Sequence, residues 1–82
     1  MLEKLKVPIA RIRVPAKRVK TLNAQTVQEI AESICDIGQS TPIRVRTEGD
    51  GYILVEGFHR LEALKALGED TIEAFLVRAQ LH

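Results

Sequence analysis

The stretch from Gly51 to Gly68 constrains the fold more than any other part of the chain, because the spacing of its apolar residues changes within it. The run Tyr-Ile-Leu-Val that follows Gly51 has the length and side chains of a strand, and a glycine before it is typical of a turn. From Leu61 onward leucines recur at helical spacing, and Gly68 stands where a left-handed helix cap belongs. The sequence therefore predicts a strand, a tight turn at Gly57 and a helix.

The turn at Gly57 has the features of a phosphate-binding site. The first N–H groups of a helix are unpaired and lie at the positive end of the helix dipole, so an anion is stabilised there. Gly57 has no Cβ to block the close approach of a ligand. Arg60 can bind phosphate oxygens through a pair of hydrogen bonds, and His59 can donate one more. The alternative is an ordinary strand-to-helix turn, in which glycine and a first-turn arginine are both common.

The first half of the chain predicts one strand and one helix. Residues 5–9 alternate between apolar and polar side chains, which is typical of a strand with one apolar face. Pro8 and Pro15 confine this strand to a sheet edge or break it into short pieces. Asn23 is a good N-cap for an amphipathic helix, which we expect to end at Gly38.

The second half adds a hairpin before the central helix and a strand after it. Residues 43–46 alternate strictly, and the turn at 48–51 joins them to the next strand in antiparallel fashion. Residues 71–77 are predicted to form a final strand. The order β-α-β-β-α-β predicts a small mixed sheet with two main helices, of the α+β (α/β) class. We expect residues 1–82 to form a single domain.

The charge of the chain is distributed unevenly. Residues 1–20 contain seven Lys or Arg residues and one Glu, although the net charge of the whole chain is only +1. A basic arm at Lys17, Arg18 and Lys20, expected as a loop, indicates an anionic partner, either DNA or the phosphates of a nucleotide. The alternative is a sheet edge that Lys and Arg protect against aggregation.

Composition excludes some classes of function. Aromatic residues make up 4% of the chain and Trp is absent, which argues against a stacking platform for single-stranded nucleic acid. Cys35, the only cysteine, is expected to be a small buried residue and not a reactive thiol. The sequence has no apolar run long enough for a membrane span and no secretion signal, so we expect a cytoplasmic protein. A thin core with an exposed sheet edge suggests a homodimer.

Segments throughout the chain match one known family in their order and approximate spacing. They are residues 7–9, 12–13, 30–34 with Gly38, 42–46, 50–52, 57–63, 66–68 and 71–72. Together they resemble the N-terminal domain of the partition protein ParB, within the ParB/sulfiredoxin-like fold. The resemblance implies a stand-alone member of this family with a role in DNA partition or in plasmid or chromosome maintenance.

The resemblance also implies a binding site for the phosphates of CTP, ATP or ADP together with Mg²⁺. The residues that it places there are Gly57, Phe58, His59 and Arg60 on the central turn and helix, with Ser40 and Thr41 from the loop before the second strand. The basic loop with Lys17, Arg18 and Lys20 occupies the region of the family's first arginine-bearing box, although its spacing is one residue shorter. A nucleoside di- or triphosphate is therefore the expected ligand.

Departures from the family pattern bear on catalysis. Sulfiredoxins have a catalytic cysteine just before the His-Arg pair, where this chain has Phe58, so sulfinic acid reduction is not expected. A free serine kinase of the same fold has an acidic base just before the glycine, and Glu56 stands there. Glu56 would then be a base, or instead would bind a first-turn N–H or pair with Arg60. Weak nucleotide hydrolysis or kinase-like activity stays open.

Two other functional classes stay open beside the nucleotide-binding domain. The first is a small phosphotransferase or nuclease that uses Glu56. The second is an adaptor that binds DNA or a protein through its basic arm.

Overall fold

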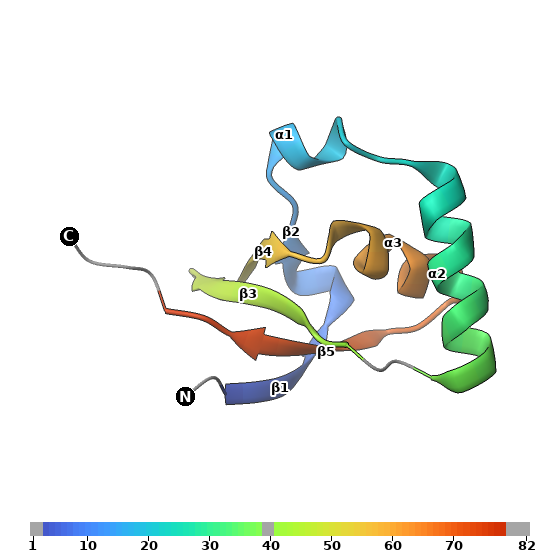
Figure 1. Ribbon diagram of the computed structural model, residues 1–82. Coiled ribbons are helices and arrows are strands. Elements are labelled where there is room, and N and C mark those ends of the chain that lie inside the picture. Colours follow the sequence, from blue (N-terminus) through green and yellow to red (C-terminus); the bar gives the residue numbers. More distant parts are fainter. Residues whose placement is uncertain (1–2, 39–40, 79–82) are drawn as a thin grey trace.

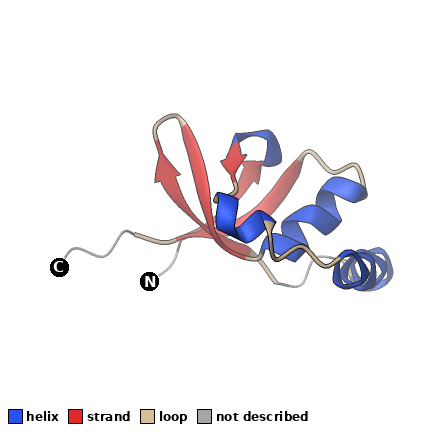
Figure 2. Cartoon of the chain, turned by 90° about the horizontal axis from the view of Figure 1, so that it is seen from above, coloured by secondary structure: helices blue, strands red, loops and turns tan. Residues whose placement is uncertain are grey.

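The computed structural model describes residues 3–38 and 41–78, and it contains one five-stranded sheet with helices (Figures 1 and 2). The strands are β1 (Glu3–Pro8), β2 (Ile12–Arg13), β3 (Ile43–Glu48), β4 (Gly51–Glu56) and β5 (Thr71–Leu76). The helices are α1 (Ala16–Val19), α2 (Ala24–Ile37), α3 (Phe58–Ala66) and the short 3-10 helix η1 (Ile9–Arg11). The mixed sheet and the α+β class predicted from the sequence are confirmed.

The sheet has the order β1-β5-β3-β4-β2. β1 is antiparallel to β5, β5 is parallel to β3, β3 is antiparallel to β4, and β4 is parallel to β2. The first predicted strand is broken into short pieces, one of the two outcomes that the prolines allowed, and η1 separates β1 from β2, which lie at opposite edges of the sheet. The break follows Pro8, and the backbone N–H of Ile9 bonds to the carbonyl of Asp70 at 2.9 Å instead of extending the strand.

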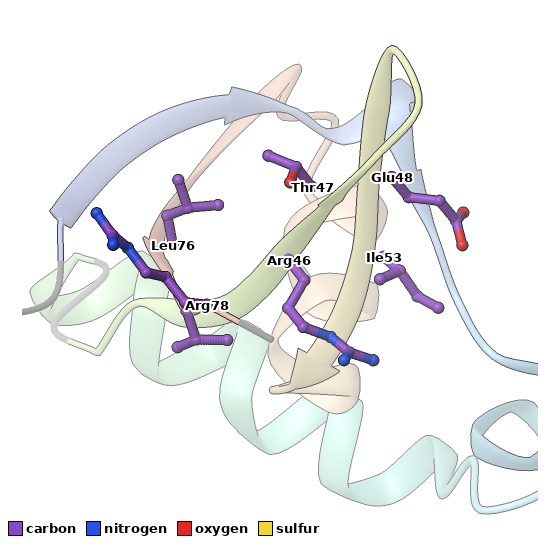
Figure 3. Close-up of a pocket in the computed structure, with 7 residues that line it drawn as sticks. Arg46, Thr47, Glu48, Ile53, Leu76 and Arg78 are labelled. Carbon is purple, nitrogen blue, oxygen red and sulfur yellow. The ribbon is translucent and has the colours of Figure 1, made fainter. Parts of the chain in front are cut away.

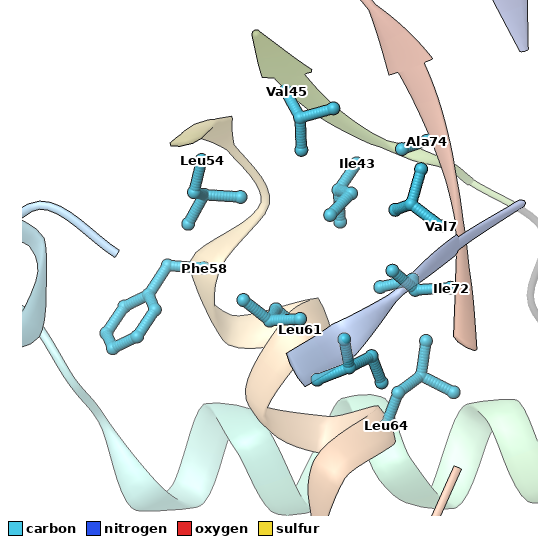
Figure 4. Packing of buried hydrophobic residues seen from close by; sticks show 10 residues of the cluster. Val7, Ile43, Val45, Leu54, Phe58, Leu61, Leu64, Ile72 and Ala74 are labelled. Carbon is cyan, nitrogen blue, oxygen red and sulfur yellow. The ribbon is translucent and has the colours of Figure 1, made fainter. Parts of the chain in front are cut away.

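The hydrophobic core lies between the sheet and α3 (Figure 4). Ile43 and Val45 of β3 are 1% and 0% exposed, whereas Arg44 and Arg46 between and after them are exposed, as the alternation predicts. Leu61 of α3 is 0% exposed and packs into the same cluster. Because side chains of both the sheet and α3 contribute to this core, the core holds α3, and therefore its N-terminus, against the sheet.

Helix α2 begins and ends where the sequence predicts. The side chain of Asn23 accepts a hydrogen bond from the Thr26 N–H at 3.0 Å, and Gly38 follows the last turn with a φ of 81°. α2 packs on α3 and has no fully buried residue. Cys35 is consequently exposed, and the expectation that it is buried is wrong. A helix that rests on another helix covers only part of its apolar stripe, which amphipathic spacing alone cannot reveal.

The predicted basic loop contains a helical turn, α1. Pro15 precedes it with a φ of −57°, and the Arg18 N–H bonds to the Pro15 carbonyl at 2.9 Å. Pro15 is the residue before the helix, with a non-helical ψ of 141°, and it carries no backbone N–H that would need a partner there. Within the described ranges, no helix is long and apolar enough to cross a membrane.

Candidate functional site

Gly57 forms the turn between β4 and α3 in a left-handed conformation, with a φ of 106°. A Cβ at this position would lie 2.6 Å from Cγ2 of Ile43, closer than side chains tolerate. The sequence argument left this space for a ligand, but in the structure the core residue Ile43 occupies it. Backbone conformation and packing therefore each require a glycine here.

The first backbone N–H groups of α3 have no hydrogen-bond acceptor within the helix. The first intrahelical bond joins the Leu61 N–H to the Gly57 carbonyl at 2.9 Å, so the N–H groups of Phe58, His59 and Arg60 precede it. The helix has no side-chain cap and no acidic residue in its first turn. An anion placed there would meet backbone donors and the positive end of the dipole.

Arg60 adds a cation to this helix end. Its side chain is half-buried, and in the described part of the chain its guanidinium has no hydrogen-bond or ion-pair partner. A basic residue in the first turn opposes the helix dipole, at a cost of about 0.3–1 kcal/mol. A bound anion would reverse the sign of that interaction, because it would be attracted both to the dipole and to Arg60.

His59 and Phe58 have roles in the fold that their sequence pattern does not disclose. The Nε2 atom of His59 accepts a hydrogen bond from the Asn23 N–H at 3.0 Å, which joins α3 to the start of α2. Nε2 is then an acceptor, and only Nδ1 remains to donate to a ligand. Phe58 is 6% exposed with its ring in the core, so it can offer a ligand only its backbone N–H.

Of the basic arm, the structure brings Arg18 to the turn. Its Nη2 donates to the carbonyl of Val55 at 2.5 Å, two residues before Gly57. Lys17 and Lys20 are exposed. The contact joins residues 37 positions apart, and no local pattern in the sequence indicates it. Binding of DNA through this arm stays a prediction.

Glu56 is the last residue of β4 and directly precedes Gly57. Its Oε2 is 3.7 Å from Nε of Arg44, its partner in the β3–β4 register, and its side chain is 66% exposed. The alternatives in which Glu56 caps α3 or pairs with Arg60 are therefore wrong. Its role as a base stays a prediction. Thr41 is exposed, and Ser40 lies outside the described residues.

Comparison with known proteins gives a family match over residues 2–81 to the ParB N-terminal domain. The chain is 37% identical over 62 residues to the probable chromosome-partitioning protein ParB of Campylobacter jejuni, covering 76% of this chain and 22% of that protein. It is 35% identical over 68 residues to a sulfiredoxin of Arabidopsis thaliana, covering 83% of this chain and 54% of that protein. The chain thus spans about a fifth to a half of these relatives.

Solved structures agree on the fold. The sulfiredoxin of Arabidopsis thaliana superposes with a TM-score of 0.83 at 31% identity, covering 94% of this chain and 86% of that one. A truncated ParB of Caulobacter crescentus in complex with CTP-γ-S gives 0.81 at 22% identity, covering 95% and 46%. A free serine kinase in complex with AMP gives 0.76 at 16% identity, covering 93% and 31%.

These likenesses agree with the fold described above. The structural matches below 25% identity establish the fold alone, whereas the family match extends over nearly all of the chain. The chain belongs to the ParB N-terminal domain family.

Proposed function

We propose that this domain binds a nucleoside di- or triphosphate, with the phosphates at the N-terminus of α3. One observation carries the proposal: the first turn of α3 has no acidic residue and no side-chain cap, yet it contains Arg60, whose guanidinium has no partner among the described residues. A phosphate would supply the negative charge that this helix end lacks.

Arg18 is a second cation for the same ligand. Its guanidinium binds only a neutral carbonyl, that of Val55, at the end of the strand that leads into Gly57. A phosphate is a stronger acceptor than a carbonyl, because charge-assisted hydrogen bonds are about twice as strong as neutral ones. A nucleotide at α3 would therefore compete for Arg18 and draw the arm closer to the site.

Mg²⁺ would enter with the nucleotide. Within the described residues, no three His, Cys, Asp or Glu side chains are grouped so that they could hold a metal ion. Mg²⁺ is commonly bound through phosphate oxygens and retained waters with few protein ligands. A nucleotide-bound Mg²⁺ would need few ligands from the protein, and its charge would offset that of the phosphates.

The biological setting we propose is DNA partition or plasmid or chromosome maintenance. The Campylobacter jejuni relative is a probable chromosome-partitioning protein, and a structural neighbour from the same class is complexed with CTP-γ-S. Another neighbour is complexed with AMP, so the shared element is a nucleotide and the base is left to experiment.

Calorimetric titration with CTP, ATP and ADP in the presence of Mg²⁺ tests the proposal. We expect one of these nucleotides to bind, and Arg60→Ala to weaken its binding about tenfold to a hundredfold, because a charge-assisted contact contributes about 1.5–3 kcal/mol. Arg60→Ala should keep the fold, since it removes a positive charge whose interaction with the helix dipole is unfavourable.

Lys65→Ala is the matched control. It removes one positive charge from the last turn of the same helix, where Lys65 pairs with Glu62 at 3.1 Å. Its nucleotide affinity should equal that of the parent protein. The proposal is refuted if no nucleotide binds, or if both variants lose the same affinity, which would indicate a general effect of charge.

A further inference from the structure

A groove of about 440 Å³ lies away from the turn at Gly57, where β3, β4 and the end of β5 meet (Figure 3). None of its lining residues belongs to α3 or to the basic arm. They are Arg46, Thr47, Glu48, Ile53, Leu76, Val77 and Arg78. We refer to it as the Arg46–Arg78 groove.

The middle of the groove is apolar and held by strand pairing. Ile53, Leu76 and Val77 are each half-buried. Leu76 pairs with Val45 in the sheet, and the Val77 N–H bonds to the Val45 carbonyl at 2.9 Å, which continues the β5–β3 contact past the end of β5. The surface is thus formed before any partner arrives, which lowers the entropy that binding would cost.

The two cations of the groove form no ion pair within the described part of the chain, unlike Lys4 and Arg44 elsewhere on the sheet. Lys4 pairs with Glu73 at 3.8 Å and Arg44 with Glu56 at 3.7 Å. In residues 3–38 and 41–78, Arg46 and Arg78 make no hydrogen bond or ion pair. Both guanidiniums are therefore available to an acidic ligand.

Glu48, the one acidic residue of the lining, forms no hydrogen bond with Arg46 or Arg78. Glu48 is bound through both carboxylate oxygens by Arg13, whose Nε and Nη2 lie 2.7 and 2.6 Å away. The charge of Arg46 also helps to lower the pKa of Glu48, but the hydrogen bonds of this carboxylate are with Arg13. The groove therefore combines an apolar middle with two guanidiniums that have no hydrogen bond or ion pair of their own among the described residues. Guanidinium binds carboxylates bidentately, and half-buried aliphatic residues favour aliphatic side chains in the ligand.

We propose that the Arg46–Arg78 groove binds an acidic peptide segment of a partner protein, in which Asp or Glu residues alternate with aliphatic ones. An extended strand places alternate side chains on opposite faces, so a segment lying across the sheet ends could direct aliphatic groups toward Ile53 and Val77. The charge of the groove complements the carboxylates. Nucleic acid is the less suitable occupant, since phosphates gain nothing from the apolar middle.

The test uses a fluorescently labelled synthetic peptide in which Glu and Leu alternate. Arg46→Gln/Arg78→Gln should weaken its binding at least tenfold, because each charge-assisted contact is worth about a factor of ten or more. Lys6→Gln/Lys65→Gln, which removes the same charge from two exposed positions outside the groove, should leave the affinity unchanged. Amide NMR signals of Ile53 and Val77 should shift on addition of the peptide.

Three further probes separate the alternatives. A peptide with Gln for Glu and one with Ser for Leu should each bind at least tenfold more weakly than the parent peptide. An oligo-dT strand should bind with the same affinity to the parent protein and to the double arginine variant. Equal binding of the Glu-Leu peptide by that variant would overturn the proposal, and so would oligo-dT binding that depends on Arg46 and Arg78 while the peptide does not bind.

Discussion

Gly57 is constrained by the fold even without a ligand. Its φ of 106° is unfavourable for any other residue, and Ile43 fills the space that a Cβ would need. A glycine at a strand-to-helix turn is therefore weak support for phosphate binding when it stands alone. Arg60 is the stronger indicator at this scale, because its position opposes the stability of the helix that contains it.

Replacing Gly57 should separate these two constraints. We expect Gly57→Ala to lower the free energy of unfolding by about 2–4 kcal/mol, the sum of backbone strain and overpacking against Ile43. Gly68→Ala is the control, since Gly68 has a φ of 79° but nothing within 4 Å of the added Cβ. It should cost about 1 kcal/mol through strain alone. Urea unfolding of both variants measures the difference, and equal losses would show that contact with Ile43 is not limiting.

At the scale of elements, the segment of residues 16–23 is held at the site by hydrogen bonds that involve side chains and not by sheet pairing. Arg18 bonds to the Val55 carbonyl at 2.5 Å, and His59 accepts from the Asn23 N–H at 3.0 Å. Both contacts reach the residues around Gly57. The position of this segment and the geometry of the helix end are therefore linked.

Hydrogen exchange can measure how firmly the segment is held. Arg18→Ala should raise the exchange rates of the Thr21 and Leu22 amides about five- to thirtyfold, since the lost contact is worth about 1–2 kcal/mol. Amides of β5 should keep their rates, because their exchange reports opening of the sheet. Lys17→Ala, a neighbouring change that removes no hydrogen bond or ion pair within the described residues, should leave every rate unaltered. Unchanged exchange at Thr21 in Arg18→Ala would show that the bond to Val55 does not hold the segment.

For the molecule as a whole, one ion pair connects an edge strand to the central hairpin. Arg13 of β2 donates to both oxygens of Glu48 on β3. The hydrogen bonds from Arg13, more than any other cause, lower the pKa of Glu48 below its ordinary value. A lowered pKa means that the folded state favours the ionised carboxylate, so the pair stabilises at neutral pH and loses this effect as the pH falls through the lowered pKa.

The pH dependence of unfolding tests this sign. The free energy of unfolding of the parent protein should exceed that of Glu48→Gln at neutral pH, and the gap should close in acid below the ordinary glutamate range. Both side chains are well exposed, so the gap should also shrink in high salt. Glu29→Gln on α2, a carboxylate without an ion-pair partner in the described ranges, is the control. A gap that persists or widens in acid would contradict the assignment.

The sequence by itself determined the local features of this protein. Asn23 starts α2, Gly38 and Gly68 follow helix ends, and Ile43 and Val45 face the core while Arg44 does not. Helix capping, left-handed glycines and strand alternation depend on residues within a few positions of each other, so they can be predicted from the sequence. The family resemblance, confirmed by the match over residues 2–81, rests on the same local motifs in order.

Only the tertiary structure decided which distant residues meet. It placed β1 and β2 at opposite edges, bound Arg18 to Val55, and paired Glu56 with Arg44 instead of Arg60. It also left Cys35 exposed, because α2 rests on α3 and not on the sheet. These outcomes depend on how whole elements pack, and a hydrogen bond or ion pair between residues far apart leaves no periodic signal in the chain.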